Sequence, residues 1–326
     1  MALPVIAAAG PGILLSGCSG PQSVLDPAGK EAGEIASLFW FLAVAAVVLW
    51  LLVMGLFVYV TRLKREPHSR NLAEVLIIGG GVVFPVVALA GLLAYALPMM
   101  PAHREPGSGL TVTVIGEQWW WRVTYQRDGE DEAIVSANEI RLPRGARTEI
   151  VLGANKVIHS FWVPALAGKL DMFPGRTTRM ALEPTRSGIF RGQCAEFCGE
   201  SHALMAFQTV VMEPDEFDAW LERESGDAQE PVSESARRGR DLFLAQGCGG
   251  CHAVRGTPAR AKIGPDLTHV GGRKSLGAGI LPVDTASLAR WTQHAEGEKP
   301  GAKMPSYDKL SADELSDIAA YLEGLK

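Results

Sequence analysis

The sequence predicts a multi-domain fold in three parts: a two-helix membrane hairpin, an all-β sandwich and an all-α carboxy-terminal domain. The chain has 326 residues, which is too long for one ordinary domain. Hydrophobic residues make up 47% of the chain, and long apolar runs lie near its amino terminus. Short β-branched segments follow these runs, and amphipathic helical segments come last.

The first 18 residues, MALPVIAAAGPGILLSGC, are apolar and end in small residues before Cys18. They resemble a bacterial lipoprotein signal, and this resemblance implies that Cys18 becomes a lipidated amino terminus after cleavage. No Lys or Arg precedes the apolar stretch, although an export signal should carry one. A simple apolar tail is therefore the alternative.

Two uncharged runs, residues 37–60 and 75–97, predict a transmembrane hairpin over residues 37–97. A helix over the first run is about 36 Å long, which is enough to cross a bilayer. Gly79 and Pro85 in the second run are tolerated in a membrane helix that has protein neighbours. The loop between the runs, TRLKREPHSRN, is basic, and the positive-inside rule places it in the cytoplasm. Everything after residue 98 then lies on the outer side.

The remaining chain divides at a polar linker. Residues 108–222 contain short β-branched and aromatic segments separated by Gly, Pro and Asp, which is typical of a sandwich. Residues 223–235 carry Gly and Pro and predict the linker. Residues 236–326 are helical at both ends, and Ser311 with Glu314 forms a predicted capping box for the last helix.

The charge balance changes at this linker. Residues 108–235 hold 12 basic and 20 acidic residues, whereas residues 236–326 hold 13 basic and 10 acidic residues. A net charge of −8 followed by +3 indicates that the two blocks attract each other. Two independently solvated surfaces are the alternative.

The sequence Cys248-Gly-Gly-Cys251-His252 is the signature of covalent haem attachment. Two thioethers hold one porphyrin edge while His252 reaches the iron. A sixth ligand is often Met, which raises the reduction potential. Met304 is the one Met after this motif, and His269 and His294 are its competitors. Together with the segment Ile263–Leu267, these features make residues 236–326 resemble a class I cytochrome c.

A second cluster of soft ligands lies in residues 194–205, CAEFCGESHALM. Zinc, a disulfide and copper are the alternatives. Zinc has enough ligands if His159 joins the two Cys and His202. Met205 is useless to zinc, whereas thiolate and thioether donors select copper. A mononuclear blue-copper site uses one Cys, so two bridging thiolates indicate two coppers.

At this point the chain resembles subunit II of a haem–copper cytochrome c oxidase, in the form with a cytochrome c fused at its carboxy terminus. The motifs that carry the resemblance are HSFWVP at residues 159–164, KLDMFPGR at residues 169–176 and the loop at residues 194–205. The resemblance implies that residues 108–222 form a Greek-key cupredoxin domain. It also implies a dinuclear CuA centre with the ligands His159, Cys194, the Glu196 carbonyl, Cys198, His202 and Met205.

Further roles follow from the same resemblance. The resemblance implies that the Glu196 carboxylate reaches a magnesium or manganese ion at the border with the partner subunit. The alternative is that this carboxylate is simply solvated on the loop. Trp119 matches the family's electron-entry tryptophan, through which electrons pass on their way to the partner's haem. A purely structural role for this aromatic stretch is the alternative. Trp120 departs from the family, which usually has Tyr there. Glu74 is either the mouth of a proton path or an interfacial anchor.

The function implied is stepwise electron transfer from a donor to haem c, then to CuA and on to haem a. The expected partners are a catalytic subunit I with haem a and CuB, subunit III, a cytochrome c or other donor, and membrane lipid, with no nucleic acid. The expected location is the bacterial inner membrane, as a multi-pass protein with both outer domains in the periplasm. A nitrogen-oxide enzyme lacks support because no large catalytic domain is present. A copper-delivery lipoprotein has no use for haem c, and quinol-oxidising relatives lack the copper ligands.

Overall fold

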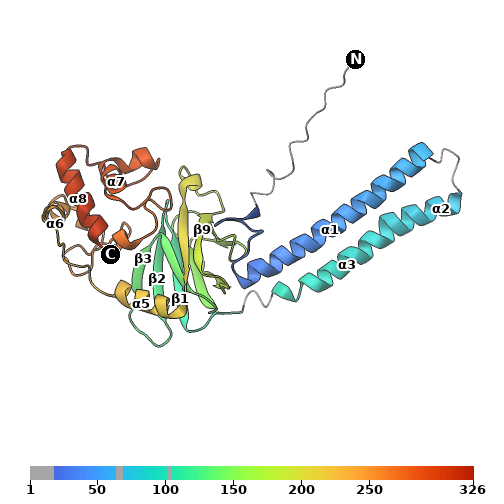
Figure 1. Ribbon diagram of the computed structural model, residues 1–326, viewed down its shortest axis with the longest axis horizontal. Coiled ribbons are helices and arrows are strands. Elements are labelled where there is room, and N and C mark those ends of the chain that lie inside the picture. The colour runs from blue at the N-terminus through green and yellow to red at the C-terminus, as the bar shows by residue number, and fades with distance from the viewer. Residues whose placement is uncertain (1–17, 64–68, 101–104) are drawn as a thin grey trace, which may run out of the picture. The chain divides into compact units, whose positions relative to one another are not determined.

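We describe a computed structural model of the chain over residues 18–63, 69–100 and 105–326 (Figure 1). The signal-like residues 1–17 and the loop residues Lys64, Arg65 and Glu66 lie outside these ranges. The chain forms two compact units, of which one comprises residues 34–105. The second comprises residues up to Gly33 together with Pro106–Lys326.

The smaller unit consists of two helical rods that are long and apolar enough to cross a membrane, Lys30–Leu63 and Arg70–Ala96. Their apolar side chains are exposed along most of their length, as lipid-facing side chains are. The second rod contains a wide π-helical stretch directly before Pro85, where a proline lacks the N–H that a regular helix requires. The rods comprise α1 (Lys30–Val58), η3 (Tyr59–Leu63), α2 (Arg70–Glu74), η4 (Val75–Val83) and α3 (Phe84–Ala96).

Glu74 ends α2 and lies at the start of the long apolar part of the second rod. Its carboxylate pairs with Arg70 Nε at 2.8 Å, one helical turn earlier. This pairing is compatible with the interfacial-anchor alternative, and the proton role stays a prediction.

The larger unit contains a sandwich of two five-stranded sheets, in the strand orders β3-β2-β1-β5-β8 and β4-β10-β9-β6-β7. Each sheet mixes antiparallel pairs with one parallel pair, β1 with β5 and β10 with β4. The first sheet comprises β1 (Leu110–Gly116), β2 (Trp121–Arg127), β3 (Ile134–Ala137), β5 (Thr148–Ala154) and β8 (Thr178–Leu182). The second comprises β4 (Glu139–Pro143), β6 (His159–Trp162), β7 (Leu170–Met172), β9 (Gly188–Cys194) and β10 (Ala206–Met212).

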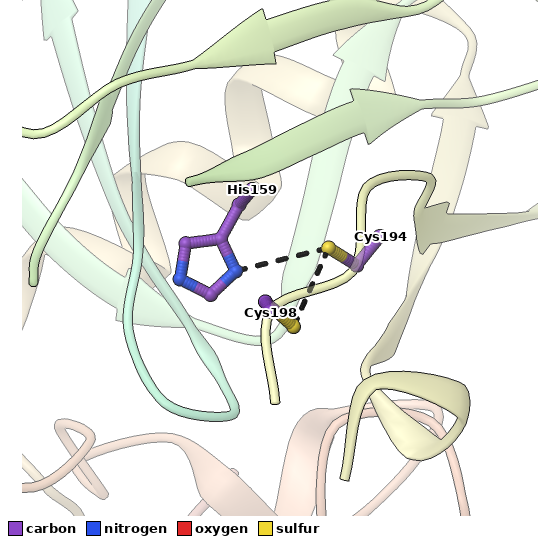
Figure 2. A group of neighbouring side chains, drawn as sticks. All are labelled: His159, Cys194 and Cys198. Atoms are coloured by element: carbon purple, nitrogen blue, oxygen red, sulfur yellow. Dashed lines mark hydrogen bonds between the residues drawn. The ribbon is translucent and has the colours of Figure 1, made fainter. Parts of the chain in front are cut away.

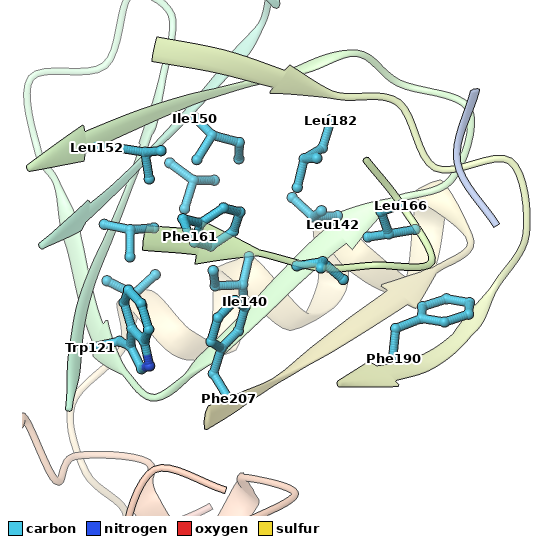
Figure 3. Packing of buried hydrophobic residues seen from close by; sticks show 14 of the residues in the cluster. Trp121, Ile140, Leu142, Ile150, Leu152, Phe161, Leu166, Leu182, Phe190 and Phe207 are labelled. Atoms are coloured by element: carbon cyan, nitrogen blue, oxygen red, sulfur yellow. The ribbon is translucent and has the colours of Figure 1, made fainter. Parts of the chain in front are cut away.

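Alternating burial along β1 and β2 directs every second side chain into the sandwich core (Figure 3). Aromatic rings fill one end of this core. The Phe207 ring centroid lies 5.1 Å from both Trp121 and Phe161. A Cβ at Gly192, on the strand β9 that pairs with β10, would lie 2.1 Å from the Phe207 ring, so glycine is required there.

The carboxy-terminal part of this unit is all-α. Helices α6 and α8 cross closely because Gly239 has no side chain; a Cβ there would lie 1.9 Å from the Asp317 carbonyl oxygen. The predicted capping box of Ser311 and Glu314 is confirmed. The elements are α5 (Pro214–Ser225), which closes the sandwich, then α6 (Glu234–Ala245), η6 (Cys248–Gly250), η7 (Val270–Gly272), α7 (Thr285–Glu298) and α8 (Ala312–Gly324). One further short helix, η5 (His202–Leu204), lies between β9 and β10. The predicted fold class, with membrane-type helices, a sandwich and a helical domain, is confirmed.

Candidate functional site

The thiols of Cys194 and Cys198 converge with His159 at one end of the sandwich (Figure 2). His159 begins β6 and Cys194 ends β9, and the structure places His159 Nδ1 3.7 Å from Cys194 Sγ. The sulfurs of Cys194 and Cys198 are also 3.7 Å apart. The ligand atoms of these three buried residues all lie within 4.8 Å of one another, which is close enough to share a metal centre.

The other three predicted donors surround the same sulfurs. His202 Nδ1 lies 3.6 Å from Cys198 Sγ, and Met205 Sδ lies 3.8 Å from it. The carbonyl oxygen of Glu196 lies 3.2 Å from Cys194 Sγ. The structure thus gathers two imidazoles, two thiols, a thioether and a carbonyl around one pair of sulfurs. This is a soft donor set that suits copper.

Backbone contacts hold this loop in shape. Cys194 N donates to the Met205 carbonyl at 2.9 Å, and Ala195 N donates to the Ser160 carbonyl at 3.0 Å. The neighbouring strand leaves room for the imidazole, because a Cβ at Gly116 would lie 2.7 Å from the His159 ring. The ring position is therefore set by β1 and β6 together.

The two thiols differ in acidity. The hydrogen bond with Cys198 lowers the pKa of Cys194, and His159 contributes in the same direction against burial. The same hydrogen bond, together with burial, raises the pKa of Cys198. Thiolate is the form that binds metal.

A cavity of about 540 Å³ accommodates the predicted haem site. The side chains of Cys248, Cys251, His252 and Met304 all line it. His252 Nδ1 lies 2.8 Å from the Pro265 carbonyl, which fixes the ring orientation and leaves the other nitrogen for a metal. Burial lowers the pKa of His252, so the ring is neutral, as ligation requires.

The segment around Gly264 supports this histidine. A Cβ at Gly264 would lie 2.6 Å from the His252 ring, so glycine is required at this contact. His269 and His294 do not line the cavity. His269 Nε2 lies 3.2 Å from the Gly226 carbonyl, and His294 Nδ1 lies 3.0 Å from Ser306 Oγ. The geometry thus favours Met304 over both competitors.

Trp119 and Trp120, from the sandwich, also line the haem cavity. The indole Nε1–H of Trp119 donates to the Cys198 carbonyl at 3.0 Å. Trp120 instead lies under Arg122, whose guanidinium carbon is 4.7 Å from the ring centroid. One tryptophan therefore contacts both this cavity and the 194–205 loop.

The helical domain lies against the sandwich through many contacts from charged side chains to backbone. Arg122 donates to the Lys262 carbonyl at 2.9 Å, Arg141 donates to the Gly272 carbonyl at 2.9 Å, and Glu139 accepts from Lys274 N at 2.6 Å. The two blocks are thus in direct contact. Charged side chains at these points pair with backbone groups.

Sequence reasoning missed one charged residue at this boundary. Lys299 is 3% exposed, and burial lowers its pKa to about 7. Its Nζ donates to the carbonyls of Leu204 and Gly277 at 2.9 and 2.8 Å. No local pattern distinguishes this lysine from a solvated one, because both of its partners are distant in sequence.

The Glu196 carboxylate is exposed and accepts a hydrogen bond from Phe197 N at 3.0 Å. The adjacent Phe197 side chain is 74% exposed. This side of the loop is therefore accessible in the isolated chain.

Comparisons with known proteins find similar sequences along most of the chain. A family model described as the periplasmic domain of cytochrome C oxidase subunit II matches residues 127–213, and a cytochrome c model matches residues 236–326. Cytochrome c oxidase subunit 2 of Alkalihalophilus pseudofirmus is 34% identical over 333 residues, covering 96% of this chain and 94% of that protein. Its counterpart in Bacillus subtilis is 32% identical over 342 residues, covering 96% and 95%. The crystal structure of the periplasmic domain of subunit II of cytochrome oxidase from Bradyrhizobium japonicum is 31% identical, covers 36% of this chain and 95% of its own, and has a TM-score of 0.34.

Proposed function

Because the chain belongs to the cytochrome c oxidase subunit II family, we propose that it is the electron-input subunit of a respiratory terminal oxidase. It carries electrons from a donor, by way of haem c and a dinuclear copper centre, to haem a of the catalytic subunit, where oxygen is reduced to water. When bound, the two groups accept and release single electrons. The chain's own residues hold these groups, orient them and exclude water from them.

The haem would be held by thioether bonds to Cys248 and Cys251, and His252 and Met304 would bind its iron. The copper centre would be held by His159, Cys194, the Glu196 carbonyl, Cys198, His202 and Met205. Burial of both thiols and of His159 keeps the copper ligands dry and rigid, so little rearranges when the charge changes. Rigid donors of this kind suit a centre that transfers electrons and does not make or break bonds.

One observation carries the proposal: Trp119 lines the haem cavity and donates a hydrogen bond to a predicted copper ligand. The indole is 9% exposed, so a largely buried side chain connects the two predicted sites. This contact supports the role of Trp119 on the route to the copper centre and onward to the partner's haem.

The exposed Glu196 carboxylate supports a magnesium or manganese ion shared with subunit I, which carries haem a and CuB. Subunit III, a cytochrome c or other donor, and membrane lipid complete the proposed partners. The two apolar rods support a multi-pass location in the bacterial inner membrane, with the sandwich and the helical domain in the periplasm.

An optical spectrum of the purified full chain tests the proposal. Haem c bands together with near-infrared CuA absorption are the expected result. Cys194→Ser should abolish the near-infrared absorption and lower the copper content from two per chain to one or none, while the haem bands remain. Two coppers and an unchanged spectrum in this variant would refute the copper assignment.

A further inference from the structure

Two segments of the helical domain flank the copper loop, which we define as residues 194–206. Ser201 Oγ donates to the Pro300 carbonyl at 2.6 Å, and Ala206 N donates to the Ala278 carbonyl at 2.9 Å. The Leu204 carbonyl between them accepts from Lys299. The helical domain thus contacts the loop at three nearby points within six residues.

One of these segments, Gly277–Gly279, is shaped to enter the sandwich; we call it the finger. All three finger residues have positive φ angles of 65°, 63° and 88°, including the non-glycine Ala278. Ala278 is fully buried and belongs to the hydrophobic core of the sandwich. A Cβ at Gly279 would lie 2.9 Å from the Ala206 Cβ, so glycine permits this close approach. A left-handed backbone at a non-glycine residue is kept only where surrounding contacts hold it.

Lys299 ties the finger to the copper loop, since one ammonium donates to both Gly277 and Leu204. In the part of the chain that the structure describes, no carboxylate forms an ion pair with this ammonium. Burying a cation costs free energy unless hydrogen bonds replace its water. The Gly277 carbonyl comes from the same domain as Lys299, whereas the Leu204 carbonyl comes from the copper loop, so the second hydrogen bond forms only in the docked arrangement and positions the two domains.

The docked arrangement covers Trp119. A Cβ at Gly301 would lie 2.7 Å from the indole ring and 2.7 Å from Glu200 Oε2, so the backbone of the helical domain lies directly on this tryptophan. A separate electron-donor protein has no room at this face while the domains are docked.

We propose that Lys299 is a positioning residue that, with the finger, latches the helical domain onto the copper loop and closes the Trp119 face to separate donor proteins. A soluble cytochrome c then delivers electrons to the haem domain and not to the copper centre. This inference rests on the proposed function and adds the residues that hold the haem domain in place on the copper loop.

Hydrogen exchange in the full-length holoprotein tests the latch directly. The Ala206 amide bonds to Ala278 across the boundary, so its exchange reports undocking. Lys299→Met removes hydrogen bonds to a charged group and should lower the protection of this amide about tenfold or more. The amide of Thr209, in a strand paired on both sides, should keep its protection. Lys309→Met, at an exposed lysine, is the matched control.

A second variant tests the latch from the sandwich side. Arg191 Nη1 donates to the Gly279 carbonyl at 2.9 Å, so Arg191→Met loosens the finger without altering the haem domain's own sequence. Exchange at Ala206 should rise in this variant too. Unchanged protection at Ala206 in both variants overturns the latch.

Kinetics add a readout that simple destabilisation does not reproduce. In Lys299→Met, internal transfer to copper should slow, while direct reduction of copper by a soluble cytochrome c should become faster. If both rates fall, or neither changes, the positioning role is wrong. If the unmodified chain shows no near-infrared absorption, the proposed function is refuted. This result is independent of the hydrogen-exchange result that tests the latch.

Discussion

Replacing Trp119 with Phe tests whether the indole contact matters for electron delivery. The substitution keeps an aromatic ring in the haem cavity but removes the N–H that bonds the Cys198 carbonyl at 3.0 Å. The indole also packs closely on the loop, since a Cβ at Gly199 would lie 3.0 Å from it. The variant therefore changes one hydrogen bond and part of one ring.

The expected loss of stability is moderate. A hydrogen bond of this kind contributes about 0.5–1.5 kcal/mol to the free energy of unfolding. The smaller ring buries roughly 40 Å² less apolar area, which is about 1 kcal/mol. The sum, about 1.5–2.5 kcal/mol, is below the ~5–15 kcal/mol that domains usually have, so the variant should fold.

Denaturant unfolding should measure this loss, and flash-triggered kinetics should show slower transfer from haem c to copper. Trp120→Phe is the matched control, because Trp120 lines the same cavity but contacts Arg122. The control should leave the internal rate nearly unchanged. Equal internal rates in Trp119→Phe and the unmodified protein, with the stability loss present, would refute the reasoning.

Three further predictions concern the sites and their supports. Gly116→Ala should displace the His159 ring and lower the copper content measured by elemental analysis. The control Gly153→Ala places its Cβ against only the flexible end of a side chain and should retain copper. Equal copper content in both variants would contradict this prediction. Met304→His should lower the haem potential in a redox titration, because a thioether raises it, and an unchanged potential would exclude Met304 as a ligand. Asp317→Asn should lower the free energy of unfolding by up to about 1 kcal/mol at neutral pH. The reason is that the Arg238 guanidinium on α6 pairs with the Asp317 carboxyl and lowers its pKa. That contribution is present above the unfolded-state pKa near 4 and is lost as pH falls through the lower folded pKa, so acid unfolding curves of both proteins should converge there.

The proposed copper ligands were predictable from sequence to the extent that they are local. Cys194, Cys198, His202 and Met205 lie within twelve residues, so one loop brings them together. His159 is 35 positions before Cys194, and only a family motif could connect it to the loop. The structure brings them together because β6 pairs with β9.

The boundary between the domains could not be predicted in the same way. Charge totals indicated attraction between the blocks, but the charged side chains at the boundary pair with backbone carbonyls and amides, which carry no sequence signal. Lys299 illustrates this, because its two acceptors are the backbone oxygens of Leu204 and Gly277. Ala278 likewise reads as a loop residue, although it completes the core of another domain.

The order of reduction tests the central claim most directly. In the purified holoprotein, a flash-generated electron should reduce haem c first and then copper, followed at the haem band and in the near-infrared. The second step should have a rate independent of protein concentration, because both sites contact Trp119 within one chain. Copper reduction that is as fast as haem reduction, or that scales with protein concentration, would contradict the account.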